Sequence, residues 1–445
     1  MTTTDDLRAR VDAVLPGVRE ALDEHIRIPS ISSLPDHADR VRQSAEWVAR
    51  RLSDVGCPDV RIVAEGGRPA VIGRFPAPEG RPTVCLYAHH DVQPTGDPDL
   101  WTSRPFEPDE RDGRLYGRGA ADDKAGFAVH LAALRAFDGR PPVGVTVFVE
   151  GEEEVGSPSI GTIIARHHDL LAADVYVIAD SGNWDAGVPA FTTTLRGLAD
   201  CVVEVRTLDH ALHSGMFGGI VPDALTALCK LLGTLHDEAG NVAIEGFAPY
   251  PAADLDYPED RLRAETGVLD GVRWLGEGSV VERLWTRPSV TVLAVDATSV
   301  ADASNTLAPV ARAKVSLRVP PGTDAHHAED LLVAHLTSHA PWGAQVRVTR
   351  GDIGQPGIVA FDGALAEAAA AAWTEAWGRP PVAIGMGGSI PMIAEFQDAF
   401  PGATVLVTAV ADPDSRQHGI DESLHLADFE NACLAETLLL ERLAR

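Results

Sequence analysis

Residues with the chemistry of metal ligands follow four apolar segments of the 445-residue sequence, at 84–88, 143–149, 175–179 and 405–410. Imidazole nitrogen and carboxylate oxygen bind zinc and other divalent metals, and a two-metal site needs a bridging carboxylate with further ligands on either side. Alone, each residue would be a helix cap or a solvated loop residue, but their joint placement predicts a metal site. The candidates are His89, Asp122, Asp180, His418 and a choice among Glu150, Glu152, Glu153 and Glu154.

The four apolar segments are rich in β-branched residues and apolar on both faces, which is typical of buried strands in a parallel sheet. Helical patterns lie between most of them, and one begins near Asp122–Asp123 with Phe127, Leu131 and Leu134 on one face. Ligands of open parallel sheets bind beyond the carboxyl ends of the strands. The sequence therefore predicts an α/β fold whose mostly parallel sheet brings these acids and imidazoles to one edge.

The middle of the chain has a different pattern. Segments 201–206, 312–319 and 345–348 alternate apolar and polar residues, as strands with one wet face do, and helical patterns at 223–236 and 324–339 lie between them. We predict an inserted α+β domain at 196–352, with helices on one face of an antiparallel sheet. The α/β domain then comprises 1–195 and 353–445, because the strand before His418 follows the insertion.

The charge and the cysteines narrow the class of protein. The 37 basic and 65 acidic residues give a net charge of −28, which disfavours binding to nucleic acid or to an anionic membrane surface. No apolar run approaches the roughly 18 residues needed to cross a bilayer, and residues 1–24 lack the apolar core of a signal peptide. Five scattered cysteines form no C-x-x-C pair, so we expect a cytoplasmic protein that acts on a small molecule.

Three motifs then carry a resemblance to metallopeptidase family 20, the aminoacylase, carboxypeptidase G and carnosinase-like enzymes. Segment 88–94 resembles the family's G-H-x-D-V-x-P, 115–124 resembles Y-G-R-G-x-x-D-[DN]-K, and 150–157 resembles E-G-x-E-E-x-G-S. Further family segments recur in order to residue 422, so the resemblance spans nearly the whole chain. Segment 235–247 suggests the dipeptidase branch.

The resemblance implies two divalent metal ions per subunit, with zinc expected and manganese or cobalt as alternatives. It makes Asp122 the bridging ligand, places His89 and Asp180 on one ion, and places Glu154 and His418 on the other. Glu153 would be the general base that activates a metal-bridging water. It also implies a cis peptide bond between Asp122 and Asp123.

Asp91 lies two residues beyond His89, where its carboxylate could accept the second imidazole N–H and fix the tautomer. The less favoured alternative is that Asp91 is simply an acid in a turn. The resemblance adds a set of substrate-binding residues, a lid that forms a homodimer, and a histidine that reaches into the partner's site to bind the developing oxyanion. That histidine is His213, and the substrate-binding residues are Asn305, Arg318, Gly387, Gly388 and Ser389.

These observations predict a metal-dependent hydrolase that cleaves peptide or amide bonds in small substrates, and the preferred hypothesis is a dipeptidase. An N-acyl-amino-acid deacylase of the same family is the alternative, because the two reactions differ only in whether the substrate has a free amino terminus. A non-catalytic binding protein on the same scaffold is a remote third reading, since all five ligands and the base are present.

Overall fold

A computed structural model describes residues 3–388 and 390–445, which form two compact units. Unit 1 contains Met1–Thr193, Val359–Ile384 and Pro391–Arg445, and unit 2 contains Thr194–Ile358 and Gly385–Ile390. Among the helices of the described residues, none combines the length and the apolar character that crossing a membrane requires.

Unit 1 is built on a six-stranded sheet with the strand order β1-β2-β6-β3-β7-β17. Four neighbouring strands run parallel, and they coincide with the four apolar segments of the sequence, while β2 and β1 are antiparallel additions at one side. The predicted mostly parallel α/β fold is confirmed. The strands are β1 (Asp59–Val63), β2 (Ala70–Phe75), β3 (Thr83–His89), β6 (Gly144–Glu150), β7 (Val175–Ile178) and β17 (Thr404–Val407).

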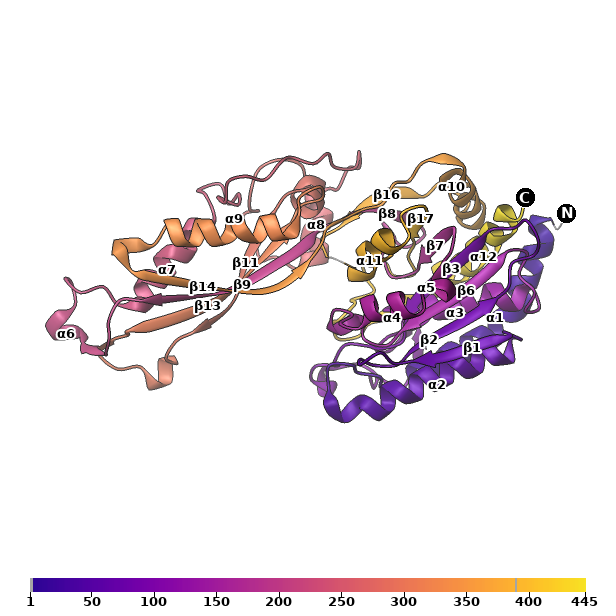
Figure 1. Cartoon of the computed structure of the whole chain (residues 1–445), viewed down its shortest axis with the longest axis horizontal. Helices are drawn as coiled ribbons and strands as arrows, with labels where there is room; N and C mark the ends of the chain where they lie inside the picture. The colour runs from indigo at the N-terminus through magenta and orange to yellow at the C-terminus, as the bar shows by residue number, and fades with distance from the viewer. Residues whose placement is uncertain (1–2, 389) are drawn as a thin grey trace. The chain divides into compact units, whose positions relative to one another are not determined.

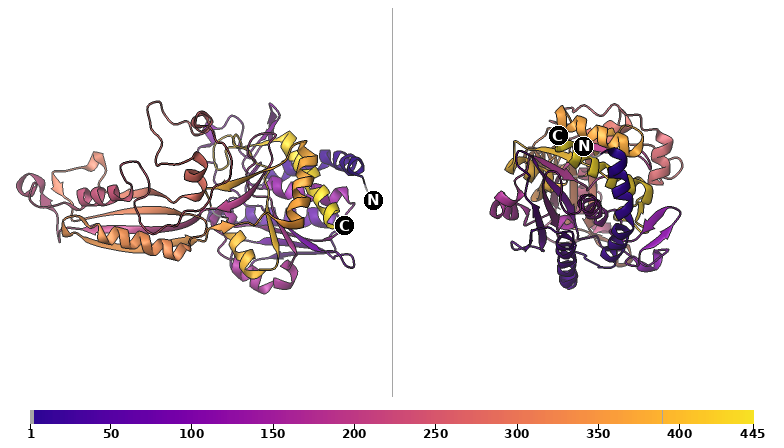
Figure 2. Two further views of the ribbon diagram at one scale, coloured as in Figure 1. Left: turned by 90° about the horizontal axis from the view of Figure 1, so that it is seen from above. Right: turned by 90° about the vertical axis from the view of Figure 1, so that its right-hand side faces the viewer.

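Helices cover both faces of this sheet, which explains why its central strands are apolar on both sides. On one face, Val145 and Val147 of β6 join a core with residues of α1, α2, α3 and α12. On the other face, Phe148 packs against Phe396 of α11, with ring centroids 6.1 Å apart. The first and last long helices, α1 and α12, lie side by side (Figures 1 and 2). The helices are α1 (Thr4–Ile26), α2 (Ala38–Asp54), α3 (Lys124–Ala136), α4 (Ile160–Arg166), α5 (His168–Leu171), α10 (Gly363–Trp377), α11 (Pro391–Ala399) and α12 (Leu426–Leu443).

A small second sheet in unit 1 joins distant parts of the chain. Its strands β4 (Asp109–Arg111), β5 (Arg114–Tyr116) and β18 (Ser423–His425) are antiparallel, and Ser423 pairs with Tyr116. The segment that precedes α3 is thereby held next to the segment that precedes α12.

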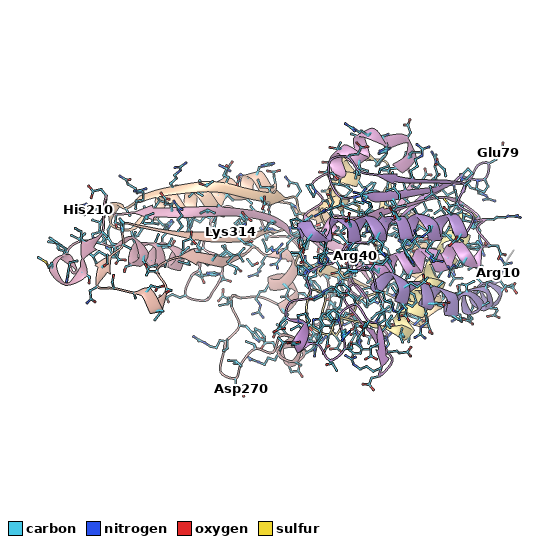
Figure 3. The ribbon with its side chains drawn as sticks, turned by 90° about the horizontal axis from the view of Figure 1, so that it is seen from below. Arg10, Arg40, Glu79, His210, Asp270 and Lys314 are labelled. Atoms are coloured by element: carbon cyan, nitrogen blue, oxygen red, sulfur yellow. The ribbon has the colours of Figure 1, made fainter. Side chains whose placement is uncertain are left out.

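Unit 2 contains a four-stranded antiparallel sheet with the order β11-β13-β9-β14. Helices α7 and α9 pack on one face, where alternate strand residues such as Val203 and Val315 are buried. Polar residues occupy the other face, where Lys314 Nζ lies 3.0 Å from Asp200 Oδ2 (Lys314 is labelled in Figure 3). The predicted antiparallel sheet with helices on one face is therefore present. The elements are β9 (Gly197–Arg206), β11 (Ser289–Asp296), β13 (Val310–Val319), β14 (Gln345–Gly354), α7 (Ala224–Leu232) and α9 (Ala325–Ser338).

Shorter elements complete the two units. They are β8 (Ala190–Leu195), β10 (Leu212–His213), β12 (Thr306–Leu307), β15 (Gly357–Ile358), β16 (Val382–Met386), α6 (Ser214–Phe217) and α8 (Glu259–Thr266).

Candidate metal centre

Two groups of potential metal ligands lie beyond the carboxyl ends of the parallel strands of unit 1. His89 ends β3 and pairs with Glu150 at the end of β6, while Asp180 follows β7 by two residues. Within each group, one ligand atom from every residue lies within 4.8 Å of the others. The groups are His89, Glu153 and Asp180, and Asp122, Glu154 and His418.

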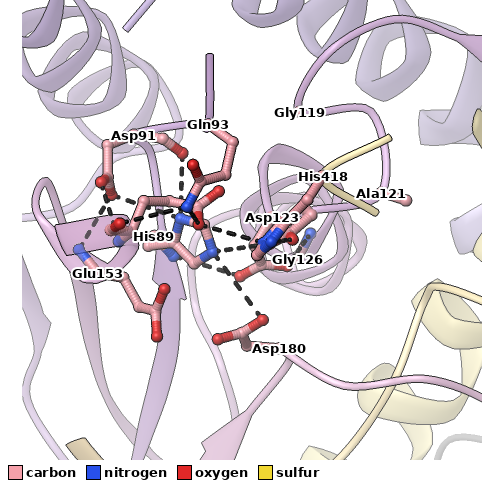
Figure 4. A network of polar contacts seen from close by, with 12 residues as sticks. His89, Asp91, Gln93, Gly119, Ala121, Asp123, Gly126, Glu153, Asp180 and His418 are labelled. Atoms are coloured by element: carbon pink, nitrogen blue, oxygen red, sulfur yellow. Dashed lines mark hydrogen bonds and ion pairs between the residues drawn. The ribbon is translucent and has the colours of Figure 1, made fainter. Parts of the chain in front are cut away.

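Asp122 lies between the two histidines. Its Oδ1 is 3.0 Å from His89 Nε2, and its Oδ2 is 3.1 Å from His418 Nε2. His418 Nε2 also lies 3.2 Å from Glu154 Oε2, and His89 Nε2 lies 3.9 Å from Asp180 Oδ1. Figure 4 shows Glu153, Asp180 and His418 around His89. The structure therefore brings together the residues for which the sequence predicted metal ligation, with Asp122 in the middle.

The donor set fits divalent metal ions. The two groups contain four carboxylates and only two imidazoles. Burial, together with the Asp122 and Glu154 carboxylates, raises the pKa of Asp180 to about 7. Burial and the Asp180 carboxylate likewise raise the pKa of Glu153 well above its usual value. Divalent cations would supply the positive charge that this cluster of acids lacks.

His89 is fixed by the residues that follow it. Its Nδ1 lies 3.1 Å from the Asp91 carbonyl oxygen and 3.4 Å from Asp91 Oδ1, so the carbonyl is the nearer acceptor. The Asp91 carboxylate instead accepts the backbone N–H groups of Glu153, at 3.3 Å, and Glu154, at 3.2 Å. Asp91 thus connects the strand end that carries His89 to the turn that carries the two glutamates.

The Asp122–Asp123 peptide bond is cis, as the family resemblance implied. The Asp123 carboxylate accepts the backbone N–H of His89 at 3.2 Å through Oδ2 and caps α3 by accepting the Gly126 N–H through Oδ1. Lys124 is fully buried and donates to the carbonyl oxygens of His25 and Ile28, at the end of α1. The turn that carries Asp122 is therefore attached to β3, to α3 and to α1.

Two residues for which the sequence predicted no role, Gln93 and Glu422, contact the site. Gln93 Nε2 donates to Glu154 Oε2 at 2.8 Å, and the Glu422 carboxylate accepts the Asp122 backbone N–H at 3.1 Å. Gln93 lies in the 88–94 motif and Glu422 ends the last of the further family segments, each four residues from a predicted histidine ligand. That proximity was the available signal, but it does not say what either side chain binds.

The other predicted site residues lie in unit 2. His213 is exposed and next to Asn305, whose carbonyl oxygen accepts the Ser214 N–H at 2.9 Å. Arg318 is half-buried in β13, and the Gly387 carbonyl oxygen accepts a hydrogen bond from Arg196 Nε at 3.2 Å. Gly388 follows directly, and Ser389 lies outside the described residues.

Comparisons with known proteins identify the family. The model of peptidase family M20/M25/M40 matches residues 85–442. A relative from Corynebacterium striatum, a cysteinylglycine-S-conjugate dipeptidase, is 36% identical over 428 residues, which cover 95% of this chain and 94% of the relative. The human Beta-Ala-His dipeptidase is 28% identical over 382 residues, covering 80% of this chain and 74% of that protein.

The fold is also that of a solved dipeptidase. The structure of the dipeptidase Dug1p from Saccharomyces cerevisiae superimposes with a TM-score of 0.85 at 25% identity, covering 100% of this chain and 99% of that chain. The family match includes every residue of both ligand groups. The chain therefore belongs to peptidase family M20/M25/M40, as its sequence motifs predicted.

Proposed function

We propose that this member of the family is a metal-dependent dipeptidase with two divalent ions at the edge of the unit 1 sheet. The observation that carries the proposal is the position of Asp122, whose two carboxylate oxygens lie 3.0 Å from His89 Nε2 and 3.1 Å from His418 Nε2. A carboxylate between two imidazoles is the arrangement that a bridging ligand needs. His89 and Asp180 would complete one ion's ligands, and Glu154 and His418 the other's.

The ions would polarise the scissile carbonyl group and lower the pKa of a water molecule, which is the chemistry that two-metal sites supply to hydrolases. Zinc suits these nitrogen and oxygen donors, and manganese and cobalt are alternatives. Metal analysis of the purified protein identifies the native ion.

Glu153 is proposed as the general base that takes a proton from water and passes it to the leaving amine. One oxygen of its carboxylate lies within 4.8 Å of a potential ligand atom of His89 and of Asp180, while its neighbour Glu154 contacts His418. Burial and the Asp180 carboxylate raise the pKa of Glu153 well above its usual value, the direction that strengthens a carboxylate as a base. The backbone N–H bond to Asp91 orients this glutamate.

The proposed substrates are small dipeptides of the cysteinylglycine or β-alanyl-histidine type, as the names of the two relatives suggest. Arg318 would bind the substrate carboxylate, because a guanidinium can form two parallel hydrogen bonds to it. Asn305 and the backbone of Gly387 and Gly388 are proposed to bind the substrate as well. Ser389 belongs to the same proposed set on sequence grounds.

We also propose a homodimer formed through unit 2, with His213 acting in the partner's site. The His213 Nδ1 accepts the Gly215 N–H at 3.1 Å, so the ring carries its proton on Nε2, as a hydrogen-bond donor to an oxyanion must. The outer strand β11 exposes Val292, Leu293 and Val295, which supports pairing along this edge. Restored activity after exchange of subunits between His213→Ala and Glu153→Ala proteins would support the proposal, and proven exchange without recovery would contradict it.

A cytoplasmic location completes the proposal. All five cysteines are free, a state that persists in a reducing compartment. Fractionation of the source cells tests this point.

The decisive experiment for the function is a substrate panel on metal-reconstituted protein. Hydrolysis of unmodified dipeptides, with little or no hydrolysis of acetyl- and succinyl-amino acids, is the expected result. The Glu153→Gln protein is the matched control, because it keeps the shape of the side chain and removes the base. Hydrolysis of acyl-amino acids alone would make the enzyme a deacylase, contrary to the proposal.

A further inference from the structure

Glu422 is a fully buried glutamate that makes an unusual number of contacts with one segment of backbone. Its Oε2 accepts hydrogen bonds from Arg118 Nη1 at 2.6 Å and from the Gly119 N–H at 3.0 Å. Its Oε1 accepts the N–H groups of Ala121, at 2.9 Å, and Asp122, at 3.1 Å. One side chain thus accepts three backbone N–H groups of the segment that ends at Asp122.

Contacts in the opposite direction join the same two segments. Arg118 Nη2 donates to the carbonyl oxygens of Gly419, at 2.9 Å, and Pro94, at 3.2 Å. The Gly117 N–H donates to the Glu422 carbonyl oxygen at 3.0 Å. We call residues 117–122 the bridge segment and residues 418–422 the His418 loop. The two are connected by the Glu422 and Arg118 side chains and by the backbone.

The His418 loop is also attached through Asp421, which accepts the Thr102 N–H at 2.9 Å, so its attachments flank the histidine rather than touch its ring. The His418 side chain is 58% exposed, and within the described residues its ring makes polar contacts with Asp122 and Glu154. Its backbone φ is +62°, a conformation that L-residues adopt rarely and that the surroundings must maintain. Two attachments join this loop to the bridge segment: the Arg118–Gly419 hydrogen bond next to His418, and the carboxylate of Glu422, which binds three backbone N–H groups of that segment.

We propose that Glu422 is a positioning residue for the half of the metal centre that contains His418. By accepting the Asp122 N–H and fixing its own loop through the same carboxylate, it sets the position of His418 relative to Asp122. It acts through backbone and touches neither substrate nor reacting atoms. The inference rests on the proposed two-metal function and adds a residue to which the sequence motifs gave no role.

A purely structural role is the competing explanation, because a buried Arg118–Glu422 ion pair could simply support folding. The two explanations differ in what a substitution changes. A positioning role affects the ion bound by Glu154 and His418 more than the ion bound by His89 and Asp180. A structural role lowers the stability of the metal-free protein and affects both ions alike.

Glu422→Gln is the test variant, because glutamine has the same shape but replaces one acceptor oxygen with an NH₂ group that cannot accept backbone N–H groups. Glu436→Gln is the matched control, since Glu436 is also a buried glutamate of unit 1 and pairs with His130. Calorimetric titration of each metal-free protein with Zn²⁺ gives the affinity of each ion, and urea unfolding of the metal-free proteins gives their stability.

We expect Glu422→Gln to bind one of the two ions, the one assigned to Glu154 and His418, 10- to 100-fold less tightly, about the loss seen when a group that orients a ligand is removed. The other ion should change much less, excess Zn²⁺ should restore kcat, and Glu436→Gln should bind both ions as wild type does. Arg118→Lys, which loses the paired contacts to Glu422 and Gly419, should show the same pattern with a smaller effect. If Glu422→Gln fails to fold, Arg118→Lys takes its place as the test variant.

Wild-type affinity for both ions in Glu422→Gln would overturn the inference. Equal weakening of both ions, accompanied by a loss of metal-free stability, would overturn it in favour of a structural role. A wild-type protein that binds one ion would instead contradict the proposed function itself, so the two failures are distinguishable.

Discussion

The two histidines of the metal centre reach Asp122 from regions of very different construction. His89 is fully buried at the end of β3. Its Nδ1 lies next to the Asp91 carbonyl oxygen, and its backbone N–H donates to the Asp123 carboxylate. His418 is 58% exposed at positive φ, on a loop that is attached by hydrogen bonds of Gly419, Asp421 and Glu422. The position of His89 is therefore set by a strand of the sheet. The position of His418 relative to Asp122 is set by hydrogen bonds between two loop segments about 300 residues apart in the sequence. We call the ligand group of His89 the sheet-built half of the centre and that of His418 the loop-built half.

The largest effect expected on the sheet-built half concerns Glu153. Replacing it with glutamine should lower kcat about 10²- to 10⁴-fold, the usual contribution of a positioned general base, while both ions remain bound. Kinetics together with metal analysis of the same sample provide the measurement.

Glu153 lies within 4.8 Å of His89 and Asp180, so it could be a metal ligand instead of the general base. If Glu153→Gln loses the ion beside His89, Glu153 is a ligand and the roles of the two glutamates need to be exchanged. Glu154→Gln is the matched control, and it should instead weaken the ion beside His418.

A second prediction compares the two histidines directly in metal-free protein. His89→Ala should lower the free energy of unfolding by about 1–3 kcal/mol, because it leaves buried polar partners unsatisfied. His418→Ala should cost less, about 1 kcal/mol or below, since the His418 side chain is 58% exposed whereas His89 is fully buried. Urea unfolding measures both values, and equal losses would show that the two halves are not built differently.

Much of the sheet-built half could be predicted from the sequence. Four apolar β-branched segments marked the parallel strands, and the carboxyl-end rule then placed His89 and Asp180 at one edge. The last strand ends at Val407 rather than at residue 410, although the Thr408 N–H still donates to the Ile178 carbonyl. Local periodicity specifies a strand but not the residue at which its ladder stops.

The loop-built half could not be predicted in the same way. Glu422 acts on backbone N–H groups about 300 positions away, and such contacts leave no periodic pattern in the sequence. The choice between Glu153 and Glu154 likewise depended on the family motif, because a run of acids by itself resembles a solvated turn. For Asp91, the sequence predicted a bond to His89, and the structure adds bonds to the backbone of both glutamates.

A third prediction follows from those Asp91 bonds. Asp91→Asn should weaken metal binding about 10- to 100-fold, because the amide can accept only one of the two N–H groups that the carboxylate accepts. Calorimetric Zn²⁺ titration measures the loss. An unchanged affinity would mean that the Asp91 carbonyl alone holds His89 in place.

The smallest effect concerns a buried histidine away from both ligand groups. Burial lowers the pKa of His130, but the Glu436 carboxylate and the Tyr87 carbonyl oxygen raise it more, so its pKa lies above the usual value. Stability from this pair is therefore fully present below the unfolded pKa of about 6.5 and is lost as pH rises through the folded pKa, at about 1.4 kcal/mol per unit of difference.

Urea unfolding from pH 6 upward tests this point, with Glu436→Gln as the comparison. The variant lacks the carboxylate that raises the pKa, so its stability should fall less with rising pH than that of wild type. Parallel pH profiles would show that the pair contributes nothing to the pH dependence of stability.

Anomalous scattering from crystals of the zinc-loaded protein tests the central claim most directly. Two peaks about 3.5–4 Å apart are expected, as in two-metal hydrolases, with Asp122 between them. His89 and Asp180 should contact one peak, and Glu154 and His418 the other. A single peak, or two peaks without contact to Asp122, would contradict the account.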